Sequence, residues 1–187
     1  MTEPRGLSHR LATMDDLPEL RALMTLSIRA LIGAYLDAAG VEASFEIMGV
    51  DSQLIEDRTY FAVECEGRIA GCGGWSRRAT LFGGDHSAGR DARLLDPAVE
   101  PARVRAMYTH PDFVRRGIGR LVLSLCEAAA AREGFRSLEL VATVAGEPSI
   151  PPTASPSSSG SPCPPRPSPS PARGWPSRSR RAPVAAR

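Results

Sequence analysis

The stretch VRAMYTHPDFVRRGIGRLVL, residues 104–123, decides the fold of this chain. Its first six residues have the apolar and β-branched character of a strand, and a proline follows two residues later. Gly117 and Gly119 then stand directly before residues that repeat apolar side chains at helical spacing as far as Glu133. The segment therefore predicts a strand, a glycine loop and a helix in succession.

A further strand completes this unit. Gly134 suits the end of the helix, and Ser137 to Ala142 then alternates apolar and polar side chains around Leu138 and Leu140. Strand, loop, helix and strand in this order form a β-α-β unit, in which the two strands run parallel.

The glycine loop has the chemistry of a pyrophosphate site. Positions without Cβ let backbone N–H groups approach an anion, and the N-terminus of the following helix favours negative charge. Arg115, Arg116 and Arg120 add positive side chains around the same point. By itself, a GxG sequence before a helix also fits a tight turn with solvated arginines.

Two nucleotide-binding motifs are excluded by sequence. A Rossmann fingerprint requires a third glycine three residues after the second, where this chain has Val122. A P-loop requires lysine before its serine or threonine, and the chain contains no lysine. Neither nucleotide-binding motif therefore fits the loop.

The surrounding sequence resembles the GNAT N-acetyltransferase family. A strand, a proline, an aromatic residue and a [Q/R]xxGxG/A loop that opens a helix are its acetyl-CoA motif, although Val114 stands where the family has Gln or Arg. RLATMDDLPELRAL (10–23) resembles the opening strand and helix, and YFAVECEGRIAGCGGW (60–75) resembles the central hairpin. The resemblance covers residues 9–148 and implies an α/β (α+β) fold with a mixed, mostly antiparallel sheet flanked by helices.

The resemblance also implies where acetyl-CoA binds. Backbone groups of the strand edge at Met107, Tyr108 and Thr109 would hold the pantetheine arm, and an N–H near Tyr108 or Thr109 would stabilise the oxyanion. The pyrophosphate would lie on backbone amides of Arg115, Arg116, Gly117, Ile118, Gly119 and Arg120. An amine of a small molecule or peptide would attack the thioester directly. The catalytic acid and base are not assigned, and we expect no metal.

Other elements follow from periodicity. We expect a first strand over His9–Ala12, a helix whose apolar face runs from Leu17 to Ile32, a short helix over Ser52–Glu56, and strands over Thr59–Cys65 and Arg68–Trp75. The polar, Gly-rich stretch Ser76–Ala102 predicts a long loop near the substrate or an ordinary solvated one. Its substrate-side candidates are Trp75, Arg77, Arg78, Phe82, Asp85 and His86.

Composition limits the class of protein. The 187 residues suit one domain, and no apolar run reaches the roughly 20 residues that span a bilayer. The N-terminus lacks the apolar core of a signal peptide, so we expect a cytoplasmic protein without membrane attachment. The four cysteines and three histidines are scattered, which favours buried or incidental thiols over a metal site. A homodimer is compatible with the sequence.

The chain changes character at Pro148. Residues 149–187 are rich in Pro, Ser and Arg and lack Asp and Glu, so we expect a GNAT domain over 1–148 and a disordered tail over 149–187. The six tail arginines exceed the net charge of +2, so the domain is acidic by four charges. A nucleic-acid or membrane-surface arm is the alternative for this tail, but its arginines are sparse among prolines, and aromatic residues other than Trp175 are absent.

The tail stands where the family continues with a helix, a tyrosine acid and two strands. Ser149 to Ser155 can be encoded by a string that, read one nucleotide earlier, gives Leu-Tyr-Thr-Ala-Tyr-Gly-Phe, which resembles the absent segment. We therefore interpret the tail as the product of a frameshift. The strand over 137–142 would then have an open edge and catalysis would lack its acid. A degenerate domain that binds acetyl-CoA without turnover is the alternative function.

Sequencing the gene across codon 148 tests the frameshift. We expect one base to be missing from a run of cytosines near that codon, so that restoring it returns the family segment. An intact reading frame with no such string would contradict this interpretation.

Overall fold

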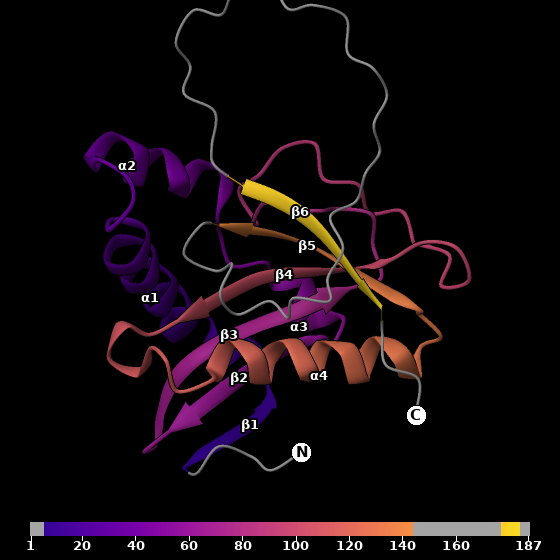
Figure 1. The fold of residues 1–187 in the computed structure, drawn as a ribbon, viewed down its shortest axis with the longest axis horizontal. Helices are drawn as coiled ribbons and strands as arrows, with labels where there is room; N and C mark the ends of the chain where they lie inside the picture. The colour runs from indigo at the N-terminus through magenta and orange to yellow at the C-terminus, as the bar shows by residue number, and fades with distance from the viewer. Residues whose placement is uncertain (1–5, 144–176, 184–187) are drawn as a thin grey trace, which may run out of the picture.

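The computed structural model describes residues 6–143 and 177–183. Its centre is a six-stranded sheet in the order β1-β2-β3-β4-β5-β6. Figure 1 shows α4 lying across the front of this sheet and the N-terminal helices behind it. The expected α/β architecture, a mostly antiparallel sheet flanked by helices, is confirmed.

From β1 to β5 the elements follow one another with short connections, except before β4. The strands are β1 (Leu7–Leu11), β2 (Tyr60–Cys65), β3 (Arg68–Ser76), β4 (Ala102–Thr109), β5 (Ser137–Thr143) and β6 (Ser177–Pro183). The α-helices are α1 (Leu17–Ser27), α2 (Ala38–Ile47), α3 (Ser52–Glu56) and α4 (Ile118–Arg132). Short 3-10 turns cover Met14–Asp16 and Pro111–Phe113. Between β3 and β4 the long loop forms a single isolated bridge, Arg78 with Leu94.

Side-chain alternation along the central strands separates two cores. In β2, Tyr60 and Ala62 pack toward α1–α3, whereas Val63 and Cys65 belong to the cluster beneath α4. Because successive strand residues point to opposite faces, one strand serves both layers. The central strands are therefore buried on both faces. In β4, Val104 likewise lies in the cluster beneath α4, and Tyr108 lies in the cluster beside α1–α3.

Glycines in β3 let α4 approach the sheet closely. A Cβ at Gly71 would lie 2.4 Å from Cγ2 of Ile118 and 3.0 Å from the carbonyl oxygen of Tyr108. Ile118, in the first turn of α4, is 2% exposed and fills this space. The glycines of β3 therefore fix the height of the helix N-terminus above the strands.

The β-α-β prediction is confirmed in the unit β4-α4-β5. β5 pairs with β4 in parallel, while β1, β2, β3 and β4 pair antiparallel in sequence. The helix predicted from Leu17 to Ile32 is also present, but it ends as α1 at Ser27 and continues as a π-helical turn over Ile28–Ile32.

Helix α2 was missed by the sequence analysis. Asp37 caps it by accepting a hydrogen bond from the amide of Gly40 at 2.9 Å. Only Val41 and Ser44 are buried in this helix, so its apolar stripe is too weak to show in the periodicity. The Asp37 cap was the one available signal.

The expectation of a tail without strands and of an open β5 edge is corrected by β6. All seven residues of β5 pair antiparallel with Ser177–Pro183. Residues 177–182 contain no proline, so their backbone N–H groups can donate to a ladder. Ser149–Ser155, on which the frameshift interpretation rests, lies outside the described residues.

Replacing Gly71 by alanine tests the contact between β3 and α4. The added Cβ meets the rigid Cγ2 of Ile118, so we expect a loss of about 1–3 kcal/mol in the free energy of unfolding, measured by urea denaturation. Removing the opposing group with Ile118→Ala should relieve the clash. The double variant is then expected to lose less free energy of unfolding than the two single variants together. Strict additivity of the two losses would contradict the contact.

Candidate active site

The loop between β4 and α4 gathers unpaired backbone amides. Gly117 stands at the N-cap of α4 with φ of 84°, and no side chain of the described residues caps the helix. The first intrahelical bond runs from the amide of Leu121 to the carbonyl of Gly117 at 2.9 Å, so the amides of residues 118–120 precede it. Arg115 also has a positive φ, of 63°. Backbone that alternates between left-handed and right-handed conformations turns successive N–H groups toward one point, which suits an anion.

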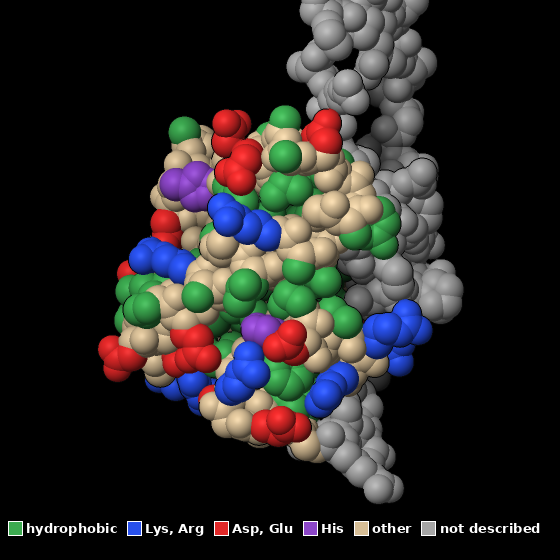
Figure 2. Space-filling model, turned by 90° about the vertical axis from the view of Figure 1, so that its left-hand side faces the viewer, with side chains coloured by type: hydrophobic (Ala, Val, Ile, Leu, Met, Phe, Trp, Pro, Cys, Tyr) green, Lys and Arg blue, Asp and Glu red, His purple; other side chains and the backbone are tan. Residues whose placement is uncertain are grey.

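The three arginines of this loop are arranged differently. Arg115 and Arg120 are exposed and form no ion pair with another described residue. Arg116 instead folds back, with its guanidinium 5.1 Å from the ring centre of Phe113 and 3.7 Å from the sulfur of Cys65. Figure 2, which faces this end of the molecule, shows hydrophobic side chains gathered in the middle with both basic and acidic side chains around them. Two of the three arginines are thus free to face an incoming anion.

A bulge turns the end of β4 away from β5. Cys72 pairs with Tyr108 but Gly74 pairs with Arg105, so Gly73 alone faces both Ala106 and Met107. Ala106 has a φ of 52°, and a Cβ at Gly73 would lie 2.6 Å from Cγ of Met107. Bulges of this kind bend a strand and increase its twist.

The two parallel strands consequently separate. Their pairing ends at Val104 and Leu140, although β4 continues to Thr109 and β5 to Thr143. Beyond Val104, the β4 edge that faces β5 pairs with no described strand. The predicted segment Met107–Thr109 therefore has an edge available to an extended ligand, and it leads directly into the glycine loop (Figure 1).

A buried ion cluster lies on the opposite face of β4. The Asp51 carboxylate has no solvent exposure and accepts hydrogen bonds from both Arg90 and Arg105. Arg105 also donates to the carbonyl of Gly83 at 2.8 Å. Burial lowers the pKa of Arg105, and the adjacent Asp51 opposes this shift. The cluster ties the long loop and the start of α3 to the bulged strand.

Two buried tyrosines support the same bulge. Tyr60 donates to the carbonyl of Ala106 at 2.7 Å, and Tyr108 donates to the carbonyl of Gly49 at 3.1 Å. Burial raises the pKa of both hydroxyls well above the usual value. They are structural donors, and they face away from the β5 edge of β4. The third tyrosine of the chain, Tyr35, is exposed.

The substrate-side candidates of the long loop are not brought together. Trp75 lies in the core beneath α4, and Arg77 pairs with Glu133 at the end of α4 at 2.8 Å. Asp85 and His86 lie on the other face, where Asp85 accepts from Ser52 and His86 contacts the carbonyl of Glu46. Arg78 pairs with Asp57, and Phe82 is 64% exposed. Asp85 and His86 lie beside Gly49 and Val50, whereas Trp75 pairs with Val104 of β4 before the bulge.

Sequence reasoning missed Asp51, Arg90 and Arg105. Asp51 precedes the predicted helix at Ser52, so its position as a helix cap was visible in the sequence. Its pairing with Arg90 and Arg105 depends on residues 39 and 54 positions away, and no local pattern encodes that.

Thiol and metal chemistry find no support in the described residues. Cys65, Cys72 and Cys126 are buried, and burial raises the pKa of Cys72 to about 12, so the reactive thiolate is disfavoured. No group of three or more His, Cys, Asp or Glu within residues 6–143 and 177–183 is placed to hold a metal ion. In the same residues, no helix is both long and apolar enough to cross a bilayer.

Comparison with known families agrees with the geometry of the loop. The profile of the acetyltransferase (GNAT) family matches residues 22–151, which is more than half of the chain. The chain belongs to the GNAT acetyltransferase family. The match includes the bulged strand, the glycine loop and α4. No curated protein sequence matches significantly.

Solved structures share the fold at low sequence identity. A GCN5-related N-acetyltransferase from Rhodopseudomonas palustris is 17% identical, with a TM-score of 0.54 over 79% of this chain and 80% of its own. The PaiA N-acetyltransferase from Thermoplasma acidophilum, solved with coenzyme A, is 11% identical, with a TM-score of 0.50 over 74% and 80%. A protein from Pyrococcus horikoshii is 17% identical, with a TM-score of 0.51 over 80% of this chain, which spans only 43% of that protein.

Replacing Asp51 by asparagine tests the buried cluster. The change leaves Arg105 charged and buried without a carboxylate, so we expect the free energy of unfolding to fall by about 3–5 kcal/mol in urea denaturation. The control is Asp112→Asn, because Asp112 is 66% exposed and lies 3.7 Å from Arg68. That variant is expected to lose less than about 1 kcal/mol. Equal losses would contradict a special role for the buried pair.

Proposed function

We propose that this GNAT-family chain is an N-acetyltransferase, which transfers the acetyl group of acetyl-CoA to a primary amine of a small molecule or peptide. The proposal rests on the combination of an uncapped α4 N-terminus at Gly117 with a β4 edge that separates from β5. An anionic diphosphate fits the first, and an extended arm with amide groups fits the second.

The residues proposed to bind the co-substrate remain those predicted from sequence. Amides of residues 115–120 would hold the pyrophosphate, with Arg115 and Arg120 adding charge attraction, and the edge at Met107–Thr109 would hold the pantetheine arm. The coenzyme A bound in the Thermoplasma acidophilum protein, which shares this fold, supports the assignment.

In the proposed reaction, the amine nitrogen bonds to the thioester carbonyl carbon, the C–S bond breaks so that coenzyme A leaves as its thiolate, and the amine proton passes to solvent or a base. A backbone N–H near Tyr108 or Thr109 would stabilise the oxyanion, because no described strand pairs with this edge of β4 beyond Val104.

The acceptor side is proposed to lie where Gly49–Asp51 meets Gly83–His86. Both segments cover the bulged part of β4, through the bond from Tyr108 to Gly49 and that from Arg105 to Gly83. Asp85 also accepts from both the amide and the hydroxyl of Ser52 at 2.8 Å, which closes the two segments together.

One observation favours the alternative of binding without turnover. Tyr60 and Tyr108 both donate to backbone carbonyls and have raised pKa values, so neither supplies a free acid for the departing thiolate. A domain that binds acetyl-CoA but lacks this acid would show affinity without release of coenzyme A.

Calorimetric titration with acetyl-CoA, combined with a thiol-release assay over a panel of primary amines, tests the function. We expect both binding and amine-dependent thiol release. Binding without release from any amine would favour the degenerate domain, and absence of binding would contradict both functions.

Gly117→Ala tests the loop against a matched control at the other end of the same helix. Gly117 and Gly134 have similar positive φ values, 84° and 88°, so alanine at either costs roughly 1 kcal/mol of stability. Only Gly117→Ala is expected to weaken acetyl-CoA binding, by about tenfold, or ~1.4 kcal/mol. Equal affinities for the two variants would contradict binding at this loop.

A further inference from the structure

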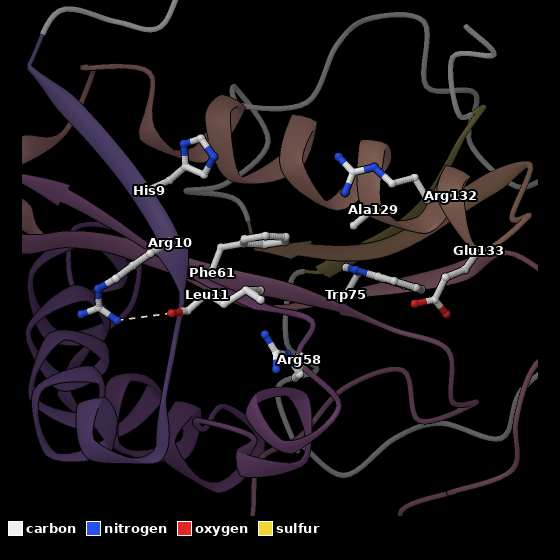
Figure 3. A pocket seen from close by; sticks show the side chains of 9 residues that line it. All are labelled: His9, Arg10, Leu11, Arg58, Phe61, Trp75, Ala129, Arg132 and Glu133. Carbon is white, nitrogen blue, oxygen red and sulfur yellow. Dashed lines mark hydrogen bonds between the residues drawn. The ribbon is translucent and has the colours of Figure 1, made fainter.

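A pocket lies at the opposite end of the sheet from the glycine loop. It has a volume of about 450 Å³ and is lined by residues of β1, β2, β3 and the C-terminal part of α4. Figure 3 shows Phe61 and Trp75 in its middle, Ala129 above them and Leu11 beside them. Its lining residues are His9, Arg10, Leu11, Arg58, Phe61, Trp75, Ala129, Arg132 and Glu133.

Two arginines on the rim have no carboxylate partner within residues 6–143. Arg58 and Arg132 are exposed, and neither forms an ion pair with a described residue. In Figure 3 they approach the pocket from opposite sides, below and above the aromatic pair. The other charges are engaged, because Arg10 pairs with Asp16 and Glu64, and Glu133 pairs with Arg77. The pocket therefore carries unneutralised positive charge.

Its aromatic floor contains an unpaired donor. Trp75 is 1% exposed, and its indole N–H has no hydrogen-bond acceptor among the described residues. Figure 3 shows this nitrogen directed toward Phe61, into the pocket. Buried N–H groups nearly always find an acceptor, so this one points to an oxygen supplied by a ligand after a small side-chain shift.

Arg58 occupies a position where glycine would be easier to accommodate. It follows the C-cap of α3 with a φ of 57°. The bonds from Arg58 to Ile55 and from Thr59 to Leu54, at 3.0 and 2.9 Å, close the turn that usually has glycine at this site. A non-glycine residue with this φ strains the backbone, and the Arg58 side chain lies on the pocket rim.

From this geometry we propose that the pocket binds a small aromatic carboxylate. The carboxylate would lie against Arg58 or Arg132 and approach the Trp75 N–H, while the flat apolar body would pack on Phe61 and Ala129. A pocket of this volume is at the small end of those that hold organic ligands. Neutral aromatic molecules would leave the guanidinium groups unpaired, and a bare anion would leave the aromatic floor uncovered.

This site is separate from the proposed acetyl-CoA site. Ala129 lies eleven residues beyond Ile118 along α4, roughly 16 Å away. The pocket meets β3 at Trp75, which pairs with Val104 before the bulge. Binding at the pocket can therefore be measured whether or not acetyl-CoA binds at the loop.

The indole N–H signal of Trp75 in a ¹H–¹⁵N correlation spectrum of the full chain gives a direct readout. Trp175→Phe assigns the signal, because the chain has two tryptophans. We expect phenylacetate to shift it saturably, with a Kd of about 1 mM or tighter. At the same concentrations, 2-phenylethanol and inorganic phosphate should each bind at least fivefold more weakly. No saturable shift with phenylacetate, or equal binding of either probe, would overturn the proposal.

Three variants separate binding from folding. Arg58→Gly should weaken phenylacetate binding at least fivefold without lowering the thermal midpoint, because glycine accepts the positive φ. Arg132→Gln should also weaken binding, whereas Arg136→Gln, an exposed arginine outside the pocket, should not. Affinity unchanged in both Arg58→Gly and Arg132→Gln, or reduced equally in Arg136→Gln, would contradict the site.

Discussion

The bulge in β4 is the constraint on which the candidate site depends. Gly73 faces two residues of β4, and the left-handed Ala106 lets the strand turn away from β5 after Val104. The hydroxyl of Tyr60 holds the Ala106 carbonyl from within the core. Without this bend, β4 and β5 would continue to pair, and the edge at Met107–Thr109 would be closed to a ligand.

Both faces of the sheet support the bend. On one face, glycines in β3 bring Ile118 and the start of α4 close to the strands, which fixes the position of the amides proposed to bind the pyrophosphate. On the other face, Asp51 joins Arg90 and Arg105, so the long loop is anchored to the bulged strand. The proposed co-substrate edge and the proposed acceptor side therefore both depend on one strand.

The rest of α4 has a separate relation to the sheet. Its last turn, together with β1, β2 and β3, encloses the pocket with Arg58, Arg132 and Trp75. The proposed co-substrate site lies at the helix N-terminus and the pocket at its C-terminal turn, so the two ends carry different chemistry on one rigid element. Uncapped amides suit a diphosphate, and guanidinium groups beside an aromatic floor suit a carboxylate with a flat body.

The sequence by itself determined the β-α-β unit, the glycine loop and the family, because strand alternation, helical spacing and the need for backbone without Cβ at Gly117 are local properties. It could not reveal α2, whose apolar stripe is weak, or the pairing of β5 with Ser177–Pro183, which joins segments far apart in the chain. The tertiary structure alone decided that Asp51 meets Arg90 and Arg105, that Trp75 and Asp85 lie on opposite faces, and that Arg58 and Arg132 share a pocket. Such contacts depend on how strands and helices pack, and the spacing of residues along the sequence does not encode which distant residues meet.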